Sequence, residues 1–297
     1  MLLRSVVGAL VLLLSFQLAL NFWQPEADQT LTYSQGNTIR AQRTIYGAGG
    51  QSVVFLGSSL TVTLQRYLEQ PGVCCLALAG MGVSDGLIIL ERLNLRPALL
   101  LVEIGRLQRK PNRVFLAELL DPPMFELREY CTAFRHGYQP ANLLVPRMER
   151  LFKPVAQPEA VDAPRPRRRN PVPSDVEVSR TLDDQRHEVD EAIQNLSDYK
   201  EPLDRLRRNG VRVVFYEVPE YRIFTDSEHA RRLREAIRQM YPEPAYGWIP
   251  IDTSDDYYTY DDQHLCDDDA YAYARYLLHQ VRLRGGVEVK ALPAYSE

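Results

Sequence analysis

Short apolar segments that end near glycine alternate with segments of helical spacing, and this alternation restricts the fold most strongly. Residues 53–56 form one apolar run that ends at Gly57, and residues 60–68 then carry apolar side chains at helical intervals. Residues 73–78 and 98–104 form the second and third runs. Runs that are apolar throughout are typical of parallel strands covered on both faces. Three such units in succession predict a doubly wound α/β fold.

The second half of the chain continues this pattern. The elements expected there are a charged helix over 184–208, a strand over 211–218, a helix over 227–240 with Ala230, Leu233, Ile237 and Met240 inward, a strand over 248–251 and a helix over 267–282. Ser84 is expected to cap the helix that follows the second strand. The sequence therefore predicts roughly five parallel strands within one domain over residues 52–297.

The N-terminal 23 residues are apolar enough to enter a membrane. The stretch from Ser5 to Trp23 contains no charged residue, and 19 residues of helix span roughly 28 Å. Arg4 before it and Trp23 at its end favour a single-pass anchor with a cytoplasmic N-terminus and a periplasmic remainder. A cleaved signal peptide would instead give a secreted protein, although no clean A-x-A cleavage site follows. Residues 24–51 would form a juxtamembrane segment.

The middle of the chain differs in composition. Residues 152–173 contain six prolines and a basic run from Arg165 to Arg169, so an insertion or surface loop is predicted at about 152–180. Such a basic run is either solvated or in contact with anionic lipid or an acidic glycan. The whole chain has a net charge of -4, which argues against nucleic acid as the main partner.

The four cysteines do not match the spacing of a metal site. Cys74 and Cys75 lie in an apolar run and are expected to be buried thiols, whereas a disulfide between Cys131 and Cys266 stays open for an exported chain. No motif indicates a metal or a nucleotide, so no cofactor is expected.

A candidate nucleophile follows the first strand. Ser59 lies between this strand and a helix, where its own N–H can face an oxyanion formed at its side chain. Ser58 is the competing nucleophile, because spacing alone does not separate the two serines. Either serine is equally suited to cap the helix.

An aspartate and a histidine near the C-terminus provide a candidate base. Asp261 precedes His264 by three residues, which allows a loop to place the carboxylate against one ring nitrogen. The same spacing recurs in Asp184 with His187, interpreted as a solvated helix face, and in Asp226 with His229, interpreted as a helix start. His136 and His279 have no such acid and are expected to be structural or exposed.

The order of these motifs resembles the SGNH or GDSL hydrolases. Gly57-Ser58-Ser59-Leu60 is similar to their G-D-S-L block, in the GSS form of membrane-anchored bacterial members. Gly80 in LALAGMGVSDGL is similar to the glycine of the second block, and Asp261 with His264 to the final D-x-x-H. The resemblance implies a three-layer α/β/α, flavodoxin-like fold. It also implies that Ser59 is the nucleophile, His264 the base and Asp261 its partner, and that the N–H groups of Ser59 and Gly80 form the oxyanion hole.

The third block departs from the family pattern. Members carry an asparagine after the third strand to donate to the oxyanion, whereas Leu107 stands at that place here. Arg106, Gln108 and Asn112 are candidate substitutes, or the hole retains only its two backbone donors.

The resemblance implies an extracytoplasmic esterase or O-acyltransferase that acts on ester-linked acyl groups of an envelope glycan or lipid. The missing asparagine keeps a second hypothesis open, a weakly catalytic or non-catalytic partner in polysaccharide modification or assembly, working beside a membrane O-acyltransferase. A lipase or lysophospholipase is a third hypothesis, which rests only on membrane proximity.

Overall fold

A computed structural model of the chain describes residues 2–23, 33–47, 52–144, 148, 175–252, 257–285 and 292. The chain divides into two compact units. Unit 1 consists of residues 1–47 and 113–163, and unit 2 consists of residues 48–112 and 164–297. Residues 113–144, expected within a domain over 52–297, therefore group with the N-terminal helices.

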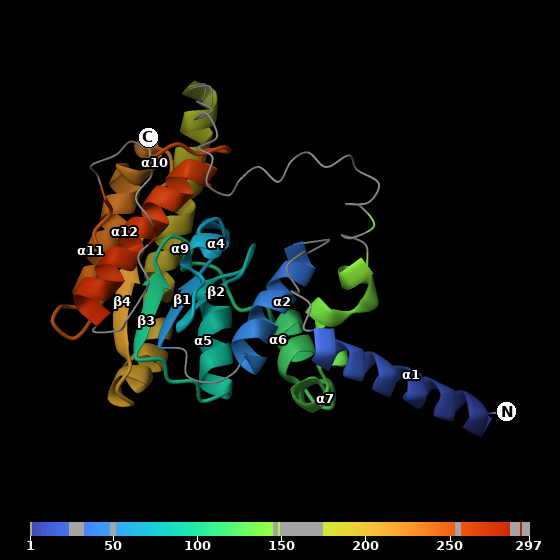
Figure 1. Cartoon of the computed structure of the whole chain (residues 1–297). Helices are drawn as coiled ribbons and strands as arrows, with labels where there is room; N and C mark the ends of the chain where they lie inside the picture. Colours follow the sequence, from blue (N-terminus) through green and yellow to red (C-terminus); the bar gives the residue numbers. More distant parts are fainter. Residues whose placement is uncertain are drawn as a thin grey trace. The chain divides into compact units, whose positions relative to one another are not determined.

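The regular elements described in unit 1 are all helical (Figure 1). Its elements are α1 (Leu2–Trp23), α2 (Tyr33–Tyr46), α6 (Arg113–Leu120), α7 (Met124–Tyr130) and the 3₁₀ turns η1 (Thr132–Phe134) and η2 (His136–Tyr138). The expected apolar helix is present, and its segment Arg4–Trp23 is long and apolar enough to cross a membrane or to act as a signal sequence. Within the segment expected to be juxtamembrane, α2 is a regular helix.

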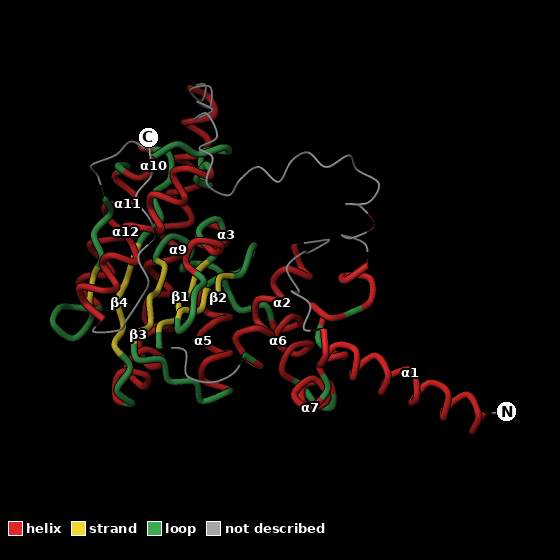
Figure 2. Tube along the Cα trace, in the orientation of Figure 1, coloured by secondary structure: helices red, strands yellow, loops and turns green. Residues whose placement is uncertain are grey.

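Unit 2 is built on a five-stranded sheet in which every strand pair is parallel (Figure 2). The strands are β1 (Val53–Gly57), β2 (Val73–Ala77), β3 (Leu99–Glu103), β4 (Arg212–Tyr216) and β5 (Gly247–Trp248), in the spatial order β2-β1-β3-β4-β5. The helices are α3 (Ser59–Val62), α4 (Gln65–Leu68), α5 (Val83–Arg92), α9 (Asp175–Arg208), α10 (Arg222–Thr225), α11 (Glu228–Met240) and α12 (Asp267–Gly285). The predicted α/β class and the five parallel strands are confirmed.

Helices pack near β1 on the side of Phe55 and on the side of Leu56, as expected of a strand that is apolar on both faces. Phe55 of β1 belongs to a buried cluster with Leu64, next to α4, and Leu277 of α12. Leu56 points to the opposite face, where a Cβ on Gly86 of α5 would lie 2.7 Å from its methyl group. Helix α9 contacts β4 and α5, and α11 packs on α9.

Several element boundaries differ from the prediction for local reasons. The helix expected over 60–68 is divided into α3 and α4, and the Thr63 hydroxyl there donates to the carbonyl of Leu60. Strand β5 ends at Trp248 rather than at residue 251, because Pro250 lacks the N–H that a ladder needs. Helix α5 is capped by Gly82 instead of Ser84, whose hydroxyl donates to the carbonyl of Arg109.

Other expectations are met in part. Ala230, Leu233 and Ile237 of α11 are buried as predicted, and Met240 is half-buried. All four cysteines are thiols, so the disulfide considered between Cys131 and Cys266 is not formed. Most of the predicted insertion, residues 152–174, lies outside the described residues, and residues 175–180 begin α9.

Candidate active site

In open α/β sheets, the order of the strands identifies the end of the sheet at which a ligand is expected to bind. Strand β1 lies between β2 and β3 in the sheet. The connection after β1 runs to β2 on one side, and the connection after β3 runs to β4 on the other side. The two connections therefore diverge outside the carboxyl ends of β1 and β3. Ser58 and Ser59 follow β1, and Gly80 lies three residues beyond β2. Because Gly57 pairs with Ala77 in the parallel register, these residues leave the sheet at the same edge.

Ser58 is a structural residue in this arrangement. Its side chain is completely buried, and its hydroxyl donates to Glu103 Oε1 at 2.7 Å. The same oxygen accepts the N–H of Leu60 at 3.2 Å and caps α3. A hydroxyl held in this way is shielded from solvent, whereas Ser59 is half-buried. The structure thus favours Ser59 over Ser58 as the reactive serine.

Glu103 at the end of β3 organises the turn after β1. It is fully buried, and its Oε2 accepts the Ser58 N–H at 2.9 Å and the Thr61 hydroxyl at 2.5 Å. Tyr216 of β4 lies 2.6 Å from the Thr61 oxygen and extends the network across the sheet. A Cβ at Gly57 would overlap Thr61 and lie 2.7 Å from the carboxylate, which explains the glycine of the GSS motif.

Replacing Glu103 by glutamine is expected to lower the free energy of unfolding by about 1–3 kcal/mol, because an amide NH₂ would face hydrogen-bond donors that now meet a carboxylate oxygen. The measurement is urea unfolding of the detergent-solubilised full chain, followed by circular dichroism. Glu201→Gln on the exposed side of α9 is the control, with an expected change within about 0.5 kcal/mol. Equal midpoints for the two variants would contradict the role given to Glu103.

Two backbone N–H groups are available near Ser59. Among the described residues, the N–H groups of Ser59 and Gly80 donate to no protein acceptor. Gly80 is exposed and has a φ of 74°, a left-handed conformation that favours glycine. Both groups are suited to bind an oxygen that acquires negative charge.

Asp261 and His264 form the hydrogen-bonded pair that their spacing predicted. His264 Nδ1 lies 2.7 Å from Asp261 Oδ2, and Asp261 Oδ1 accepts the His264 N–H at 2.8 Å. The ring of Tyr260 stacks on the imidazole, with 5.6 Å between the centroids. The carboxylate thus fixes the ring orientation and leaves Nε2 as the nitrogen that can exchange a proton with a substrate group.

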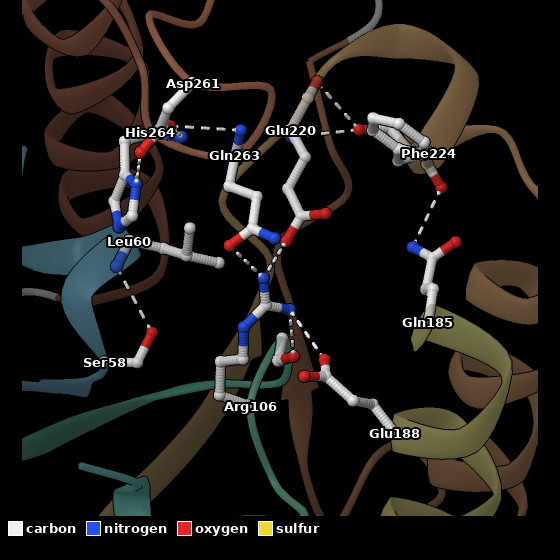
Figure 3. A network of polar contacts seen from close by, with 12 residues as sticks. Ser58, Leu60, Arg106, Gln185, Glu188, Glu220, Phe224, Asp261, Gln263 and His264 are labelled. Carbon is white, nitrogen blue, oxygen red and sulfur yellow. Dashed lines mark hydrogen bonds and ion pairs between the residues drawn. The ribbon is translucent and has the colours of Figure 1, made fainter. Parts of the chain in front are cut away.

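The loop that carries His264 is held at the same edge of the sheet as Ser59. Tyr221, which follows β4, donates its N–H to the carbonyl of Asp262 at 3.0 Å. Leu60 and Leu265, which adjoin Ser59 and His264, belong to one buried hydrophobic cluster. In the view of Figure 3, the imidazole of His264 is drawn beside Leu60, the second residue of α3. Ser59 and His264 therefore both belong to segments that lie outside the carboxyl ends of the strands.

Arg106 joins the loop after β3 to the histidine loop (Figure 3). Its Nη2 lies 2.8 Å from Glu220 Oε1 and donates to Gln263 Oε1 at 3.1 Å, and its Nη1 donates to the carbonyl of Gly105 at 2.9 Å. Glu188 of α9 lies 3.6 Å from Nη1. Gln263 immediately precedes His264, so Arg106 braces the histidine loop.

The ion pair between Arg106 and Glu220 is largely buried. Burial by itself lowers the pKa of Arg106, and the carboxylates of Glu220, Glu188 and Glu103 more than offset this effect, so that its pKa is raised. Burial raises the pKa of Glu220, and Arg106 only partly opposes that shift. A buried carboxylate in this position depends on its arginine partner.

The three candidate substitutes for the missing asparagine have other surroundings. Both terminal nitrogens of Arg106 are engaged as described above. Gln108 is buried and lines a cavity of about 30 Å³ together with α9 and α11 residues. The N–H of Asn112 donates to Asp85 at the start of α5, and its side chain is exposed. The two backbone N–H groups remain the clearest oxyanion donors.

The competing acid and histidine pairs are not assembled in this way. Asp184 and His187 are both exposed on α9, as expected of a solvated helix face. Asp226 pairs with Arg222 at 3.4 Å, and the cap of α11 is Ser227. Nδ1 of His229 has no hydrogen-bond partner among the described residues. His136 contacts Gln42 within unit 1, and His279 is exposed.

Comparison of the chain with protein-family models gives no match, and comparison with curated proteins or with solved structures gives none either. The case for an active site therefore rests on the residues themselves.

Sequence reasoning missed Glu103 and the Arg106 network. Glu103 is the one acidic residue in an otherwise apolar strand, and a carboxylate at the buried end of a parallel strand is a signal for a polar network. Arg106 follows that strand by three residues, but its partner Glu220 is distant in sequence.

Proposed function

We propose that this chain is a serine esterase or O-acyltransferase of the SGNH type. The observation that carries the proposal is the Asp261–His264 pair, 2.7 Å apart, on a loop held at the sheet edge where Ser59 begins α3. Ser59 is half-buried, while Ser58 is occupied by Glu103. A serine with an oriented imidazole and free backbone N–H groups is the arrangement that acyl transfer requires.

The proposed mechanism gives each group a defined role. Nε2 of His264 takes the Ser59 proton as the hydroxyl attacks the acyl carbon of an ester, and Asp261 stabilises the resulting imidazolium. The N–H groups of Ser59 and Gly80 bind the oxyanion of the tetrahedral intermediate. His264 then returns the proton to the departing alcohol. Water completes hydrolysis, and a sugar hydroxyl in its place completes transfer of the acyl group.

The strand order supports the family assignment. The order β2-β1-β3-β4-β5 is that of flavodoxin-like sheets. Helices on both faces fit the three-layer arrangement that the motif resemblance implies.

The proposed substrate class follows from the N-terminal helix. An anchor formed by α1 would hold unit 2 outside the cytoplasm, close to acylated glycans and lipids of the envelope. We therefore propose an ester-linked acyl group on an envelope glycan or lipid as the substrate. No cofactor enters the proposed mechanism.

A second candidate function is a non-catalytic or weakly catalytic partner in envelope polysaccharide modification, beside a membrane O-acyltransferase. It is favoured by Leu107, which is buried where the family asparagine would donate. Loss of one oxyanion donor costs about 10²–10³ in rate. A weakly active enzyme could therefore show as little turnover as a binding protein. A test for a reactive serine distinguishes the two.

Labelling with a fluorophosphonate tests the proposal. The full chain in detergent is treated with the probe, digested and mapped by mass spectrometry. We expect one modified serine, Ser59, and loss of the modification when His264 is replaced by alanine. An unmodified Ser59 after prolonged treatment, with the chain folded by circular dichroism, would favour the non-catalytic partner.

Arg106 offers a separate prediction for the histidine loop. Arg106→Lys keeps the charge but loses the planar fork that contacts both Glu220 and Gln263. We expect kcat for p-nitrophenyl acetate to fall about 10-fold, since a loosely held base costs this order of rate or more. Arg205→Lys, on an exposed part of α9, is the control and is expected to leave kcat unchanged. Equal kcat values for both variants would remove Arg106 from the positioning of His264.

A further inference from the structure

The two strongly polar residues between Ser5 and Trp23 of α1, Gln17 and Asn21, have partners within unit 1. Gln17 Oε1 accepts the N–H of Ala133 at 2.9 Å and the thiol of Cys131 at 3.3 Å. Its Nε2 donates to Asn21 Oδ1, one helical turn further on, at 2.9 Å. A polar side chain in an apolar environment needs such partners. Gln17 thus ties η1 to a helix that is otherwise suited to lipid.

One face of α1 packs against unit 1 while the rest is exposed. Leu13, Phe16 and Gln17 are half-buried and Leu20 is buried, at intervals that place them on one side of the helix. These positions occupy the C-terminal half of α1. That half is therefore part of the folded unit.

Unit 1 also exposes large apolar side chains outside α1. Those of α7 are Met124, Leu127 and Tyr130, spaced three residues apart on one face, while Glu126 and Glu129 occupy the neighbouring arc. Val114, Leu144 and Met148 are exposed as well. Among the described residues of unit 2, the exposed large apolar side chains are those of Ile223, Tyr260 and Leu283. Exposed apolar residues gathered in this way mark an interaction surface.

The position of Gln17 sets a depth for this surface. Trp23 follows Gln17 by six positions in α1, which corresponds to about 9 Å along the helix axis. If Trp23 marks the membrane boundary and α1 runs along the bilayer normal, the N–H of Ala133 that donates to Gln17 lies about 9 Å below this boundary. Interfacial helices bury their apolar faces by about 5–10 Å, so the two depths agree. Because η1 contacts both α1 and α7, α7 would lie close to the same depth.

We infer that unit 1 is a membrane-interface module in which α1 is a permanent anchor and the Met124, Leu127 and Tyr130 face of α7 inserts into the lipid bilayer. The occupant of this face is the headgroup and upper acyl region of the same leaflet that α1 enters at Trp23. The inference is independent of the proposed catalytic function.

Depth-dependent fluorescence quenching tests the inference. The full chain with Leu127→Cys, in a Cys131→Ser and Cys266→Ser background, is labelled with an environment-sensitive fluorophore and reconstituted in phosphatidylethanolamine and phosphatidylglycerol vesicles. Cys74 and Cys75 are buried and are not expected to react. Ile223→Cys in the same background is the matched control, because Ile223 of unit 2 and Leu127 are both 42% exposed.

We expect a shallow doxyl-labelled lipid to quench the label at position 127 at least threefold more than the label at position 223, and the mass of the membrane-extracted protein to include residues 1–23. Equal quenching at the two positions would overturn the lipid contact. A blue-shifted emission at position 127 without lipid quenching would assign the face to a protein partner and also overturn it. A mature chain that begins after Trp23 would overturn the permanent anchor.

Discussion

Ser59→Ala is expected to lower kcat/KM for p-nitrophenyl acetate by about 10³-fold or more in the full chain. Loss of the nucleophile in a serine triad removes covalent catalysis and leaves only the contribution of binding and the oxyanion donors. The half-buried side chain of Ser59 makes no hydrogen bond that supports the fold among the described residues. The unfolding midpoint of Ser59→Ala should therefore match that of the unmodified chain, which separates a catalytic loss from a folding loss.

Ser58→Ala is the matched control for the nucleophile. This change keeps Ser59 but removes the hydroxyl that donates to Glu103 and caps Leu60. The expected result is a loss of about 1–3 kcal/mol in the free energy of unfolding, with fluorophosphonate labelling of the folded fraction retained. The opposite pattern, with labelling lost in Ser58→Ala and kept in Ser59→Ala, would make Ser58 the nucleophile.

The sheet was predictable because burial on both faces leaves a continuous apolar signal. Strands β1, β2 and β3 have five residues each, and all of these residues are buried. Glu103 is the one charged residue among them. The short β5 was harder to delimit, because its end depends on Pro250 and on pairing with β4, a strand far away in sequence. No periodic pattern in the sequence predicts that residues 113–144 group with α1. This grouping depends on contacts between distant residues, such as the hydrogen bond between Gln17 and Ala133.

The candidate site was predictable only where its partners are close in sequence. Asp261 and His264 are three residues apart, so their contact follows from local loop geometry. The bonds from Ser58 to Glu103 and from Arg106 to Glu220 join segments brought together by strand pairing. The residue types of Ser58 and Arg106 do not identify Glu103 and Glu220 as their partners. The sequence therefore does not separate Ser58 from Ser59 as the nucleophile, whereas the burial of Ser58 does.

Asp261→Asn is the second large expected effect, with kcat for p-nitrophenyl acetate reduced between about 10²- and 10⁴-fold. An amide at this position can present its NH₂ group to His264 Nδ1 and so stabilise the wrong tautomer, which costs about 10⁴ in triads with a buried aspartate. The side chain of Asp261 is 45% exposed, so water can replace part of its function and the lower end of the range applies if it does.

Asp226→Asn is the matched control, because Asp226 precedes His229 with the same spacing but pairs with Arg222 on an exposed surface. Its kcat is expected to stay within about twofold of the unmodified chain. Fluorophosphonate labelling should slow in Asp261→Asn and proceed normally in Asp226→Asn, since only the former change affects the base that activates Ser59. A loss of activity confined to Asp226→Asn would instead identify His229 as the base. Asp261 and His264 would then have no role in catalysis.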